Sequence, residues 1–212
     1  MGEKSLRIET VAVFGGSRLG HNPAYERDAV KLGEILAKQN RKVVVGSPRG
    51  LVRAFSDAFI DNGGHLSVLT TPHNCRAVND NQPNVHTIEV STDNDRTIEL
   101  LKRSDAWISL AGSGGTIGET VRGMTWNVDR SYRNRPITPQ ILLNTAGVYT
   151  PLRETYKRAA DDGFSGAHIL DLFDLVDTPQ DVEQLLTRLD HEEQKIVAPV
   201  SGDHSAISLR HP

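Results

Sequence analysis

Short apolar runs alternate along the chain with longer segments in which apolar residues recur every three or four positions. Runs of the first kind predict β-strands, and the periodic segments predict helices with one buried face. The predicted strands are 10–14, 43–45, 65–69, 86–90, 106–110, 140–144 and one near 168–172. The predicted helices begin at Pro23 and at Leu51, and others cover about 94–103, 116–126, about 148–161 and about 178–190.

Strands that are separated by helices favour one mostly parallel sheet with helices on both faces. The predicted fold class is therefore a doubly wound, Rossmann-like α/β fold, with a single catalytic domain over residues 1–193. Residues 71–84 are polar and rich in turn formers, which predicts a surface loop. Residues 194–212 have no periodicity, so we expect a C-terminal tail or an arm that wraps a partner.

The composition is that of an ordinary globular protein, with 37% hydrophobic and 24% charged residues in a chain of 212. No apolar run approaches the roughly 20 residues that span a bilayer, and the first ten residues lack the apolar core of a secretory signal. Cys75 is the one cysteine and cannot close an intrachain disulfide. These features predict a cytoplasmic protein without a membrane partner.

The charge is uneven along the chain. The net charge is −3, but residues 161–193 hold ten acidic residues and Arg188 as their one basic residue. This asymmetry indicates either a solvated acidic face on the last helices or a positive remainder that suits an anionic small molecule. A nucleic-acid partner is not expected, because no Lys/Arg stripe with interleaved aromatic residues occurs.

Three glycine-bearing loops follow predicted strands and precede predicted helices. They contain Gly15, Gly16 and Ser17; Gly46 and Gly50; and Gly112, Ser113, Gly114, Gly115 and Thr116. Free amides at a helix start, together with the helix dipole, attract anions, and glycine lets an anion approach the backbone. Glycine also ends strands for local reasons, so one such loop could be structural, whereas three together predict phosphate binding. The dinucleotide and triphosphate fingerprints GxGxxG and GxxxxGK[ST] are absent.

Glu119 follows the third loop by one helical turn, and Arg96 belongs to the helix before the same strand. Glu119 could be a carboxylate beside a bound anionic ligand, or it could cap its own helix together with Thr116. Arg96 could take part in the same site or form a solvated salt bridge.

Four segments together resemble the LOG ("Lonely Guy") cytokinin-activating proteins. LAGSGGTIGETVRGMTW is similar to the family's PGGxGTxxE segment, and DNDRTIELLKRSDAW is similar to its MHxRK helix and strand. VAVFGGSRLG and VVVGSPRGLVRAFSDA are similar to the first and second glycine loops of the family. The four segments occur in the family's order over residues 10 to about 190.

The resemblance implies a Rossmann-like phosphoribohydrolase that cleaves a nucleoside 5′-monophosphate, either AMP or a cytokinin-type nucleotide, into free base and ribose 5-phosphate. It implies Arg96 and Glu119 as the catalytic pair, with Gly112, Gly115 and Thr116 holding phosphate and ribose. It implies no metal or organic cofactor, and it implies a homodimer or a higher homo-oligomer that packs through the helix 116–126. Arg122, one turn beyond Glu119, could then reach toward the neighbouring site, or it could be a surface charge.

Several positions depart from the family pattern, and they leave open a non-catalytic nucleotide-binding or molybdenum-cofactor carrier protein on the same fold. The departures are Ala111, Ser113, Gly118, Arg53 and the residues around Arg96, which are Asp93, Asn94, Asp95 and Thr97.

A metal site is not expected, because the eight histidines lack ligand spacing and His73 with Cys75 is an isolated pair.

Overall fold

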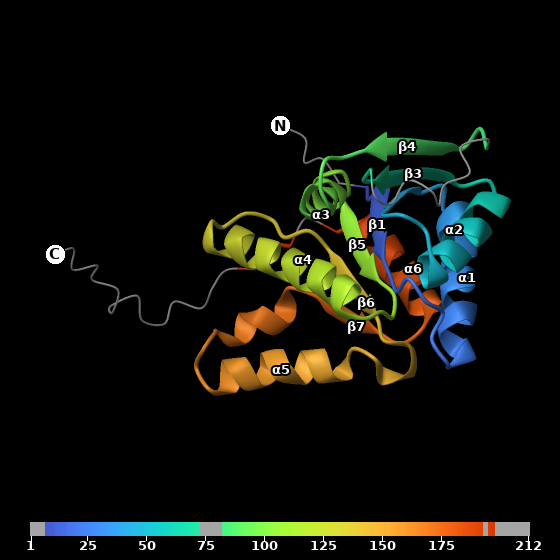
Figure 1. Cartoon of the computed structure of the whole chain (residues 1–212). Coiled ribbons are helices and arrows are strands. Elements are labelled where there is room, and N and C mark those ends of the chain that lie inside the picture. Colours follow the sequence, from blue (N-terminus) through green and yellow to red (C-terminus); the bar gives the residue numbers. More distant parts are fainter. Residues whose placement is uncertain (1–6, 73–81, 193–194, 198–212) are drawn as a thin grey trace.

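The computed structural model describes residues 7–72, 82–192 and 195–197. Seven parallel strands form one sheet in the order β4-β3-β2-β1-β5-β6-β7 (Figure 1). The strands are β1 (Thr10–Phe14), β2 (Lys42–Val45), β3 (His65–Thr70), β4 (Val85–Glu89), β5 (Ala106–Ser109), β6 (Gln140–Leu143) and β7 (Asp174–Val176). The predicted doubly wound α/β class is confirmed.

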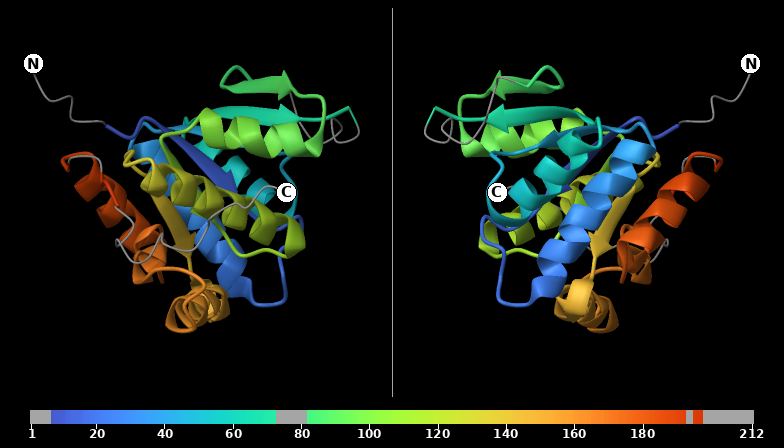
Figure 2. Two further views of the ribbon diagram at one scale, coloured as in Figure 1. Left: turned by 90° about the vertical axis from the view of Figure 1, so that its left-hand side faces the viewer. Right: turned by 90° about the vertical axis from the view of Figure 1, so that its right-hand side faces the viewer.

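Six α-helices flank the sheet within the described ranges. They are α1 (Pro23–Lys38), α2 (Gly50–Asp61), α3 (Asp93–Lys102), α4 (Gly114–Tyr132), α5 (Thr150–Asp161) and α6 (Pro179–Leu189). Helix α1 packs between α2 and α6, and these three face the viewer in the right-hand view of Figure 2. Helices α3 and α4 cover the opposite face, which the left-hand view shows.

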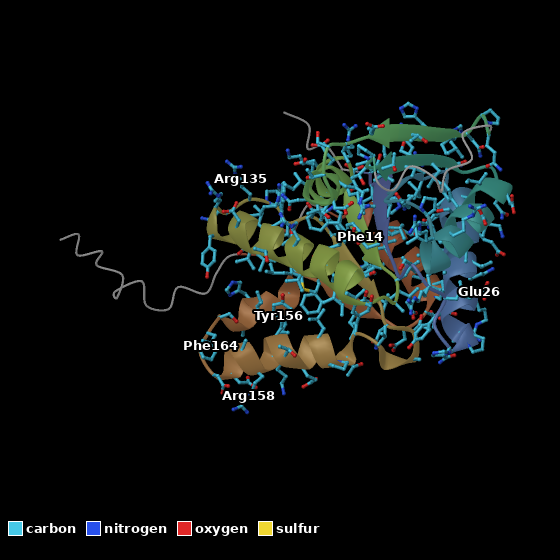
Figure 3. All side chains as sticks on the ribbon, in the orientation of Figure 1. Phe14, Glu26, Arg135, Tyr156, Arg158 and Phe164 are labelled. Atoms are coloured by element: carbon cyan, nitrogen blue, oxygen red, sulfur yellow. The ribbon has the colours of Figure 1, made fainter. Side chains whose placement is uncertain are left out.

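The alternation of side chains along β1 explains why both faces are covered. Val11 and Val13 are buried in the large cluster with the residues of α1, α2 and α6. Ala12 and Phe14 point the other way, into a cluster with α3. Phe14 therefore lies in the interior, whereas Phe164 projects from the turn after α5 and is 85% exposed (Figure 3). A strand that is buried on both faces has a continuously apolar sequence, and residues 10–14 have such a sequence.

The strand order reverses at the centre of the sheet. From β1 the chain proceeds outward through β2 and β3 to β4, and it then returns to β5 on the other side of β1. Connections after β1 and β5 leave in opposite directions at such a point, which opens a crevice at the carboxyl ends of the strands. The first and third glycine loops follow these two strands, and the second follows the neighbouring β2.

The strand predicted near 168–172 is wrong. Residues Ala167–Asp171 form a short 3-10 helix, and the edge strand β7 comes afterwards. Ile169 and Leu172 are three positions apart, and both pack into a small cluster with Ile137 and Val197. A short apolar run fits the spacing of apolar residues in a strand as well as that in a helix, and here the contacts favour the helical spacing.

Helix α4 begins at Gly114 and continues to Tyr132, beyond the predicted end at Trp126. Asn127 is fully buried within this extension. Its side-chain amide donates to the carbonyls of Thr138 and Leu172, and its Oδ1 accepts from Thr138 N at 2.9 Å. The helix thus continues past Trp126 through a buried polar side chain whose partners lie far away in the sequence.

Part of the predicted loop 71–84, including His73 and Cys75, lies outside the described residues, as does most of the predicted tail 194–212. Within that tail, the carbonyl of Lys195 accepts from Ile137 N at 3.0 Å, and Val197 is buried. The tail thus begins against the domain, and its further course stays a prediction. None of the helices in the described ranges is both long and apolar enough to span a bilayer.

Candidate functional site

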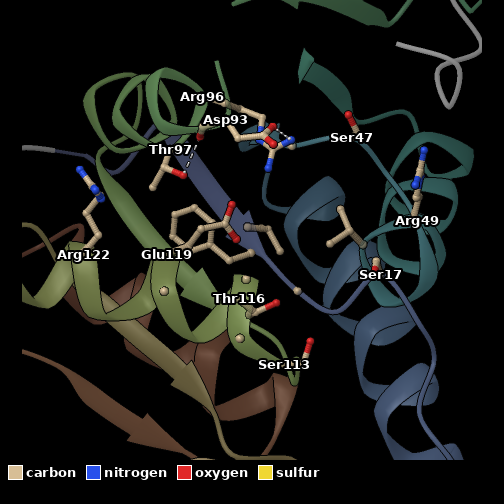
Figure 4. A pocket seen from close by; sticks show the side chains of 18 of the residues that line it. Ser17, Ser47, Arg49, Asp93, Arg96, Thr97, Ser113, Thr116, Glu119 and Arg122 are labelled. Atoms are coloured by element: carbon tan, nitrogen blue, oxygen red, sulfur yellow. Dashed lines mark hydrogen bonds and ion pairs between the residues drawn. The ribbon is translucent and has the colours of Figure 1, made fainter. Parts of the chain in front are cut away.

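A cavity of about 610 Å³ opens at the carboxyl ends of the central strands (Figure 4). Its walls come from the loops after β1, β2 and β5 and from the first turns of α3 and α4. The lining residues are Val13, Phe14, Gly15, Ser17, Gly46, Ser47, Arg49, Val52, Asp93, Asn94, Arg96, Thr97, Ser113, Gly114, Gly115, Thr116, Gly118, Glu119 and Arg122.

The structure brings most of the predicted site residues into this one cavity. Both predicted catalytic residues, Arg96 and Glu119, line it. The predicted binding residues that line it are Gly15, Ser17, Gly46, Ser113, Gly114, Gly115 and Thr116. Gly16, Gly50 and Gly112 belong to the same loops but lie outside the lining.

Gly16 connects the loops, and Gly50 and Gly112 lie where the chain is tightly packed. Gly16 N donates to Ala111 O at 2.9 Å, and Gly16 O accepts from Leu51 N at 2.9 Å, so backbone hydrogen bonds join all three loops. Gly50 has φ +51°, and a Cβ there would lie 2.2 Å from Arg18 N. A Cβ at Gly112 would lie 2.2 Å from Thr116 Oγ1. No larger side chain fits at either position without movement of its neighbours.

The start of α4 presents free amides to the cavity. The first helical hydrogen bond of α4 runs from Ile117 N to Ser113 O at 2.9 Å, so the amides of Gly114, Gly115 and Thr116 precede the helical ladder. A Cβ at Gly114 or Gly115 would meet nothing within 4 Å, which leaves open space beside the backbone. This geometry suits an anion with several oxygen atoms.

The expectation that every glycine loop directly opens a helix is wrong for the first loop. Helix α1 begins at Pro23 after an Asn22 cap, and Gly20 with φ +80° lies in the intervening segment. The first turn of α1 borders a different hollow, which Pro23, Glu26 and Arg27 help to line. Helices α2 and α4, but not α1, therefore direct their amino ends toward the cavity.

Glu119 lies on the second turn of α4, because the helix begins at Gly114 and its cap residue is Ser113. The capping alternative is thus not supported, and no hydrogen bond or ion pair engages the carboxylate within the described part of the chain. Burial raises the pKa of Glu119 to about 7, Arg96 lowers it, and Asp93 raises it further. A carboxyl with a pKa near 7 can both donate and accept a proton near neutral pH, as general acids and bases do.

Arg96 reaches from α3 across the cavity edge. Its Nη1 lies 3.0 Å from Asp93 Oδ1, and its side chain is 18% exposed. The guanidinium passes close to Gly46, where a Cβ would lie 3.4 Å from Nε. The Nε–H is buried and has no acceptor among the described residues. The solvated salt-bridge alternative describes only half of this pair, because the Asp93 side chain is 66% exposed whereas the Arg96 side chain is largely covered and lines the cavity.

A hydrogen-bond network behind the cavity fixes the third loop. The Tyr149 hydroxyl donates to Leu110 O at 2.6 Å, and burial raises the pKa of Tyr149 to about 12. Ser109 Oγ and Thr120 Oγ1 lie 2.8 Å apart, and Thr120 Oγ1 also donates to Thr116 O at 2.8 Å. Nothing in the sequence pattern points to Tyr149, because it acts through a contact 39 positions away.

Five polar residues that line the cavity were not predicted as site residues: Ser47, Arg49, Asp93, Asn94 and Thr97. Asp93 and Thr97 lie on the face of α3 that carries Arg96, so the helical period points to these two. Arg122, which the sequence offers as a candidate for the site of a neighbouring copy, lines the cavity of its own chain. Three arginines and two carboxylates line the cavity, a balance that suits an anionic ligand. Within the described ranges, no cluster of His, Cys, Asp and Glu could hold a metal ion.

Comparison with known proteins identifies the family. The model of the SLOG cluster4 family matches residues 8–128, more than half of the chain. The chain belongs to the SLOG cluster4 family. This SLOG chain is 31% identical to a cytokinin riboside 5′-monophosphate phosphoribohydrolase of Arabidopsis thaliana over 166 residues, which cover 77% of the chain and 76% of the relative. A second Arabidopsis thaliana phosphoribohydrolase of the same name is 29% identical over 215 residues, covering 98% of the chain and 96% of the relative.

The resemblance to the LOG proteins, drawn from four short segments, is confirmed by these matches over most of the chain. The SLOG chain is also similar in fold to the molybdenum cofactor binding protein from Rippkaea orientalis. That match has a TM-score of 0.66 at 17% identity, and it covers 87% of this chain and 98% of the other. At this identity the likeness concerns the fold alone.

Proposed function

We propose that this protein hydrolyses the N-glycosidic bond of a nucleoside 5′-monophosphate, such as AMP or a cytokinin-type nucleotide. The bond between C1′ of the ribose and the base nitrogen breaks, the oxygen of water becomes attached to C1′, and the base leaves with a proton. The products are the free base and ribose 5-phosphate.

The observation that carries the proposal is the position of Glu119 beside the open start of α4. The amides of Gly114, Gly115 and Thr116 suit a phosphate group, and the Glu119 carboxyl lies one turn further along the same cavity. A phosphate held at the helix start places the attached ribose toward Glu119. The ionised carboxylate can then stabilise the positive charge that develops on the ribose and can orient the attacking water.

Arg96 has the second role in this proposal. Its side chain reaches from α3 into the cavity that Glu119 lines from α4 (Figure 4). It can balance negative charge on the departing base, or it can contact the phosphate, and both roles use its fixed positive charge. In the free protein Arg96 lowers the pKa of Glu119, but burial has the larger effect.

The likeness in fold to a molybdenum cofactor binding protein favours a second candidate, a non-catalytic carrier of a nucleotide or of a phosphate-bearing cofactor. The free amides at α4 would serve a carrier equally well. A desolvated carboxyl favours the enzyme, because a carrier of anions has no use for a buried acid beside its ligand.

The two candidates are separated by one assay. Purified protein is incubated with a panel of nucleoside 5′-monophosphates, including a cytokinin-type nucleotide, and free base is measured by chromatography. The enzyme releases base from at least one of them. A protein that binds nucleotides but releases no base from any of them would be a carrier.

The proposal includes a homodimer that packs through α4. Ile117 is 42% exposed, and a hollow on the outer side of α4 is lined by Val121, Thr125 and Trp126. Gly118 and Arg122 line both this hollow and the cavity, so a second copy seated here would border the site. Met124 does not contribute to this face, because it is buried against the sheet.

A further inference from the structure

Arg96 and Glu119 line the same cavity, yet no ion pair joins them in the described structure. The Arg96 guanidinium pairs instead with Asp93, three residues earlier on α3. Two carboxylates therefore act on one guanidinium: Asp93 through an ion pair, and Glu119 through its charge across the cavity.

Asp93 is itself held in place. Its Oδ1 accepts from Thr71 Oγ1 at 3.4 Å, and Thr71 is buried directly after β3. Its backbone carbonyl accepts from Thr97 Oγ1 at 3.2 Å. Two hydrogen bonds thus hold Asp93, although its side chain is 66% exposed, and it presents its carboxylate to Arg96. The guanidinium lies close to Gly46, where a side chain would crowd it.

The charged groups around Glu119 come from several elements. Arg96 and Asp93 reach it from α3, Arg122 lies one turn further along α4, and Arg49 lines the cavity at the start of α2. Tyr149 follows β6 and interacts electrostatically with Glu119. After burial, the causes that move the pKa of Glu119 are Arg96, which lowers it, and Asp93, which raises it.

We propose that Asp93 is a positioning residue of this site, which holds the Arg96 guanidinium over Gly46 and so prevents a direct ion pair between Arg96 and Glu119. The inference rests on the proposed function for its purpose, because hydrolysis needs both groups available to the ligand. Removing the Asp93 charge leaves Arg96 free to swing toward Glu119, where it would neutralise the carboxylate before a ligand arrives.

The test measures the ionisation of Glu119 without any turnover. The stability of the protein and of its Glu119→Gln variant is compared by urea unfolding between about pH 4.5 and pH 9, and the difference between the two curves reports the midpoint of the Glu119 titration. The same pair is then made in an Asp93→Asn background. We expect the midpoint to fall by about one pH unit or more, because a like charge is lost and a guanidinium moves to within hydrogen-bonding distance.

Asp95→Asn is the matched control. Asp95 carries the same charge in the same first turn of α3, but its carboxylate bonds to Thr92 and it does not line the cavity. Its loss should leave the midpoint unchanged. Asp93→Glu keeps the charge and should return the midpoint toward that of the unaltered protein. A midpoint that does not move in Asp93→Asn, or that moves equally in Asp95→Asn, would overturn the inference.

Kinetics provides the second readout. With an active nucleotide, the pH profile of kcat/KM in Asp93→Asn should shift toward acidic pH together with the stability midpoint. A purely structural role for Asp93 would lower the melting temperature and leave both profiles in place, which would contradict the inference. If no nucleotide is hydrolysed, the proposed function fails, and the stability titration still decides the role of Asp93.

Discussion

Replacement of Glu119 by glutamine keeps the size and polarity of the side chain and removes its charge. Because one pKa unit corresponds to about 1.4 kcal/mol, a rise from 4.5 to about 7 means that ionised Glu119 costs the folded state about 3 kcal/mol. The carboxyl is not completely buried, so a cost of about 2–3 kcal/mol is the better expectation.

The sign of this effect depends on pH. The stability that the protonated carboxyl confers is fully present below its unfolded pKa of 4.5 and is lost as the pH rises through about 7. Glu119→Gln is neutral at every pH and avoids this loss. At pH 8.5 the variant should be more stable than the unaltered protein by about 2–3 kcal/mol, which corresponds to a melting temperature roughly 5–10 °C higher. At pH 4.5 the two proteins should melt together.

The same variant should lose its turnover. The charge acts on the transition state in the proposed mechanism, so kcat should fall at least about a hundredfold while the affinity for the monophosphate stays within a few-fold. Calorimetry, base release and nucleotide titration measure the three quantities. Glu154→Gln on the exposed side of α5 removes the same charge outside the cavity and should change none of them. A Glu119→Gln protein that is less stable at pH 8.5, or that retains activity, would refute this reasoning.

Four further outcomes are expected. Nucleosides should be cleaved at least about a hundredfold less efficiently than their 5′-monophosphates, because several charge-assisted hydrogen bonds of roughly 1.5–3 kcal/mol each are lost with the phosphate; equal turnover of both would contradict phosphate binding at the loops. Gly115→Ala should leave the melting temperature nearly unchanged and raise KM, whereas Gly50→Ala should destabilise the folded protein by about 2 kcal/mol or more, because its Cβ would meet backbone atoms. A calorimetric measurement in which Gly115→Ala lowers the melting temperature more than Gly50→Ala would disprove this. Arg96→Ala should abolish base release and weaken nucleotide binding, and normal base release would exclude it from the mechanism. Light scattering at micromolar concentration should give a dimer that Ile117→Glu converts to a monomer, and a fully active unaltered monomer would exclude the dimer.

The sequence was most informative where one local pattern decides the structure. The apolar run 10–14, the helical face of α1 and the glycine loops are local features, and each occurs where it was predicted. Three loops at the ends of neighbouring parallel strands must also meet, so the composition of the cavity was largely predictable once the fold class was known.

The errors come from positions that tertiary contacts decide. Leu172 contributes to an apolar run that suggests a strand, yet it packs with Ile137 below a 3-10 turn. Helix α4 was predicted to end at Trp126, yet it continues to Tyr132, and within this extension Asn127 is buried and hydrogen-bonded to Thr138 and Leu172. The pairing of Arg96 with Asp93 rather than with Glu119 depends on distances across the cavity, which no sequence spacing records.

Mutation affects the anion-binding part and the proposed catalytic part of the cavity differently. The amides of Gly114, Gly115 and Thr116 belong to the peptide backbone, and a substitution other than proline cannot delete a peptide N–H. The groups proposed for chemistry are two side chains, Arg96 and Glu119, and one codon change can remove either. A single substitution can therefore abolish the proposed catalysis while the site keeps its capacity to hold an anion.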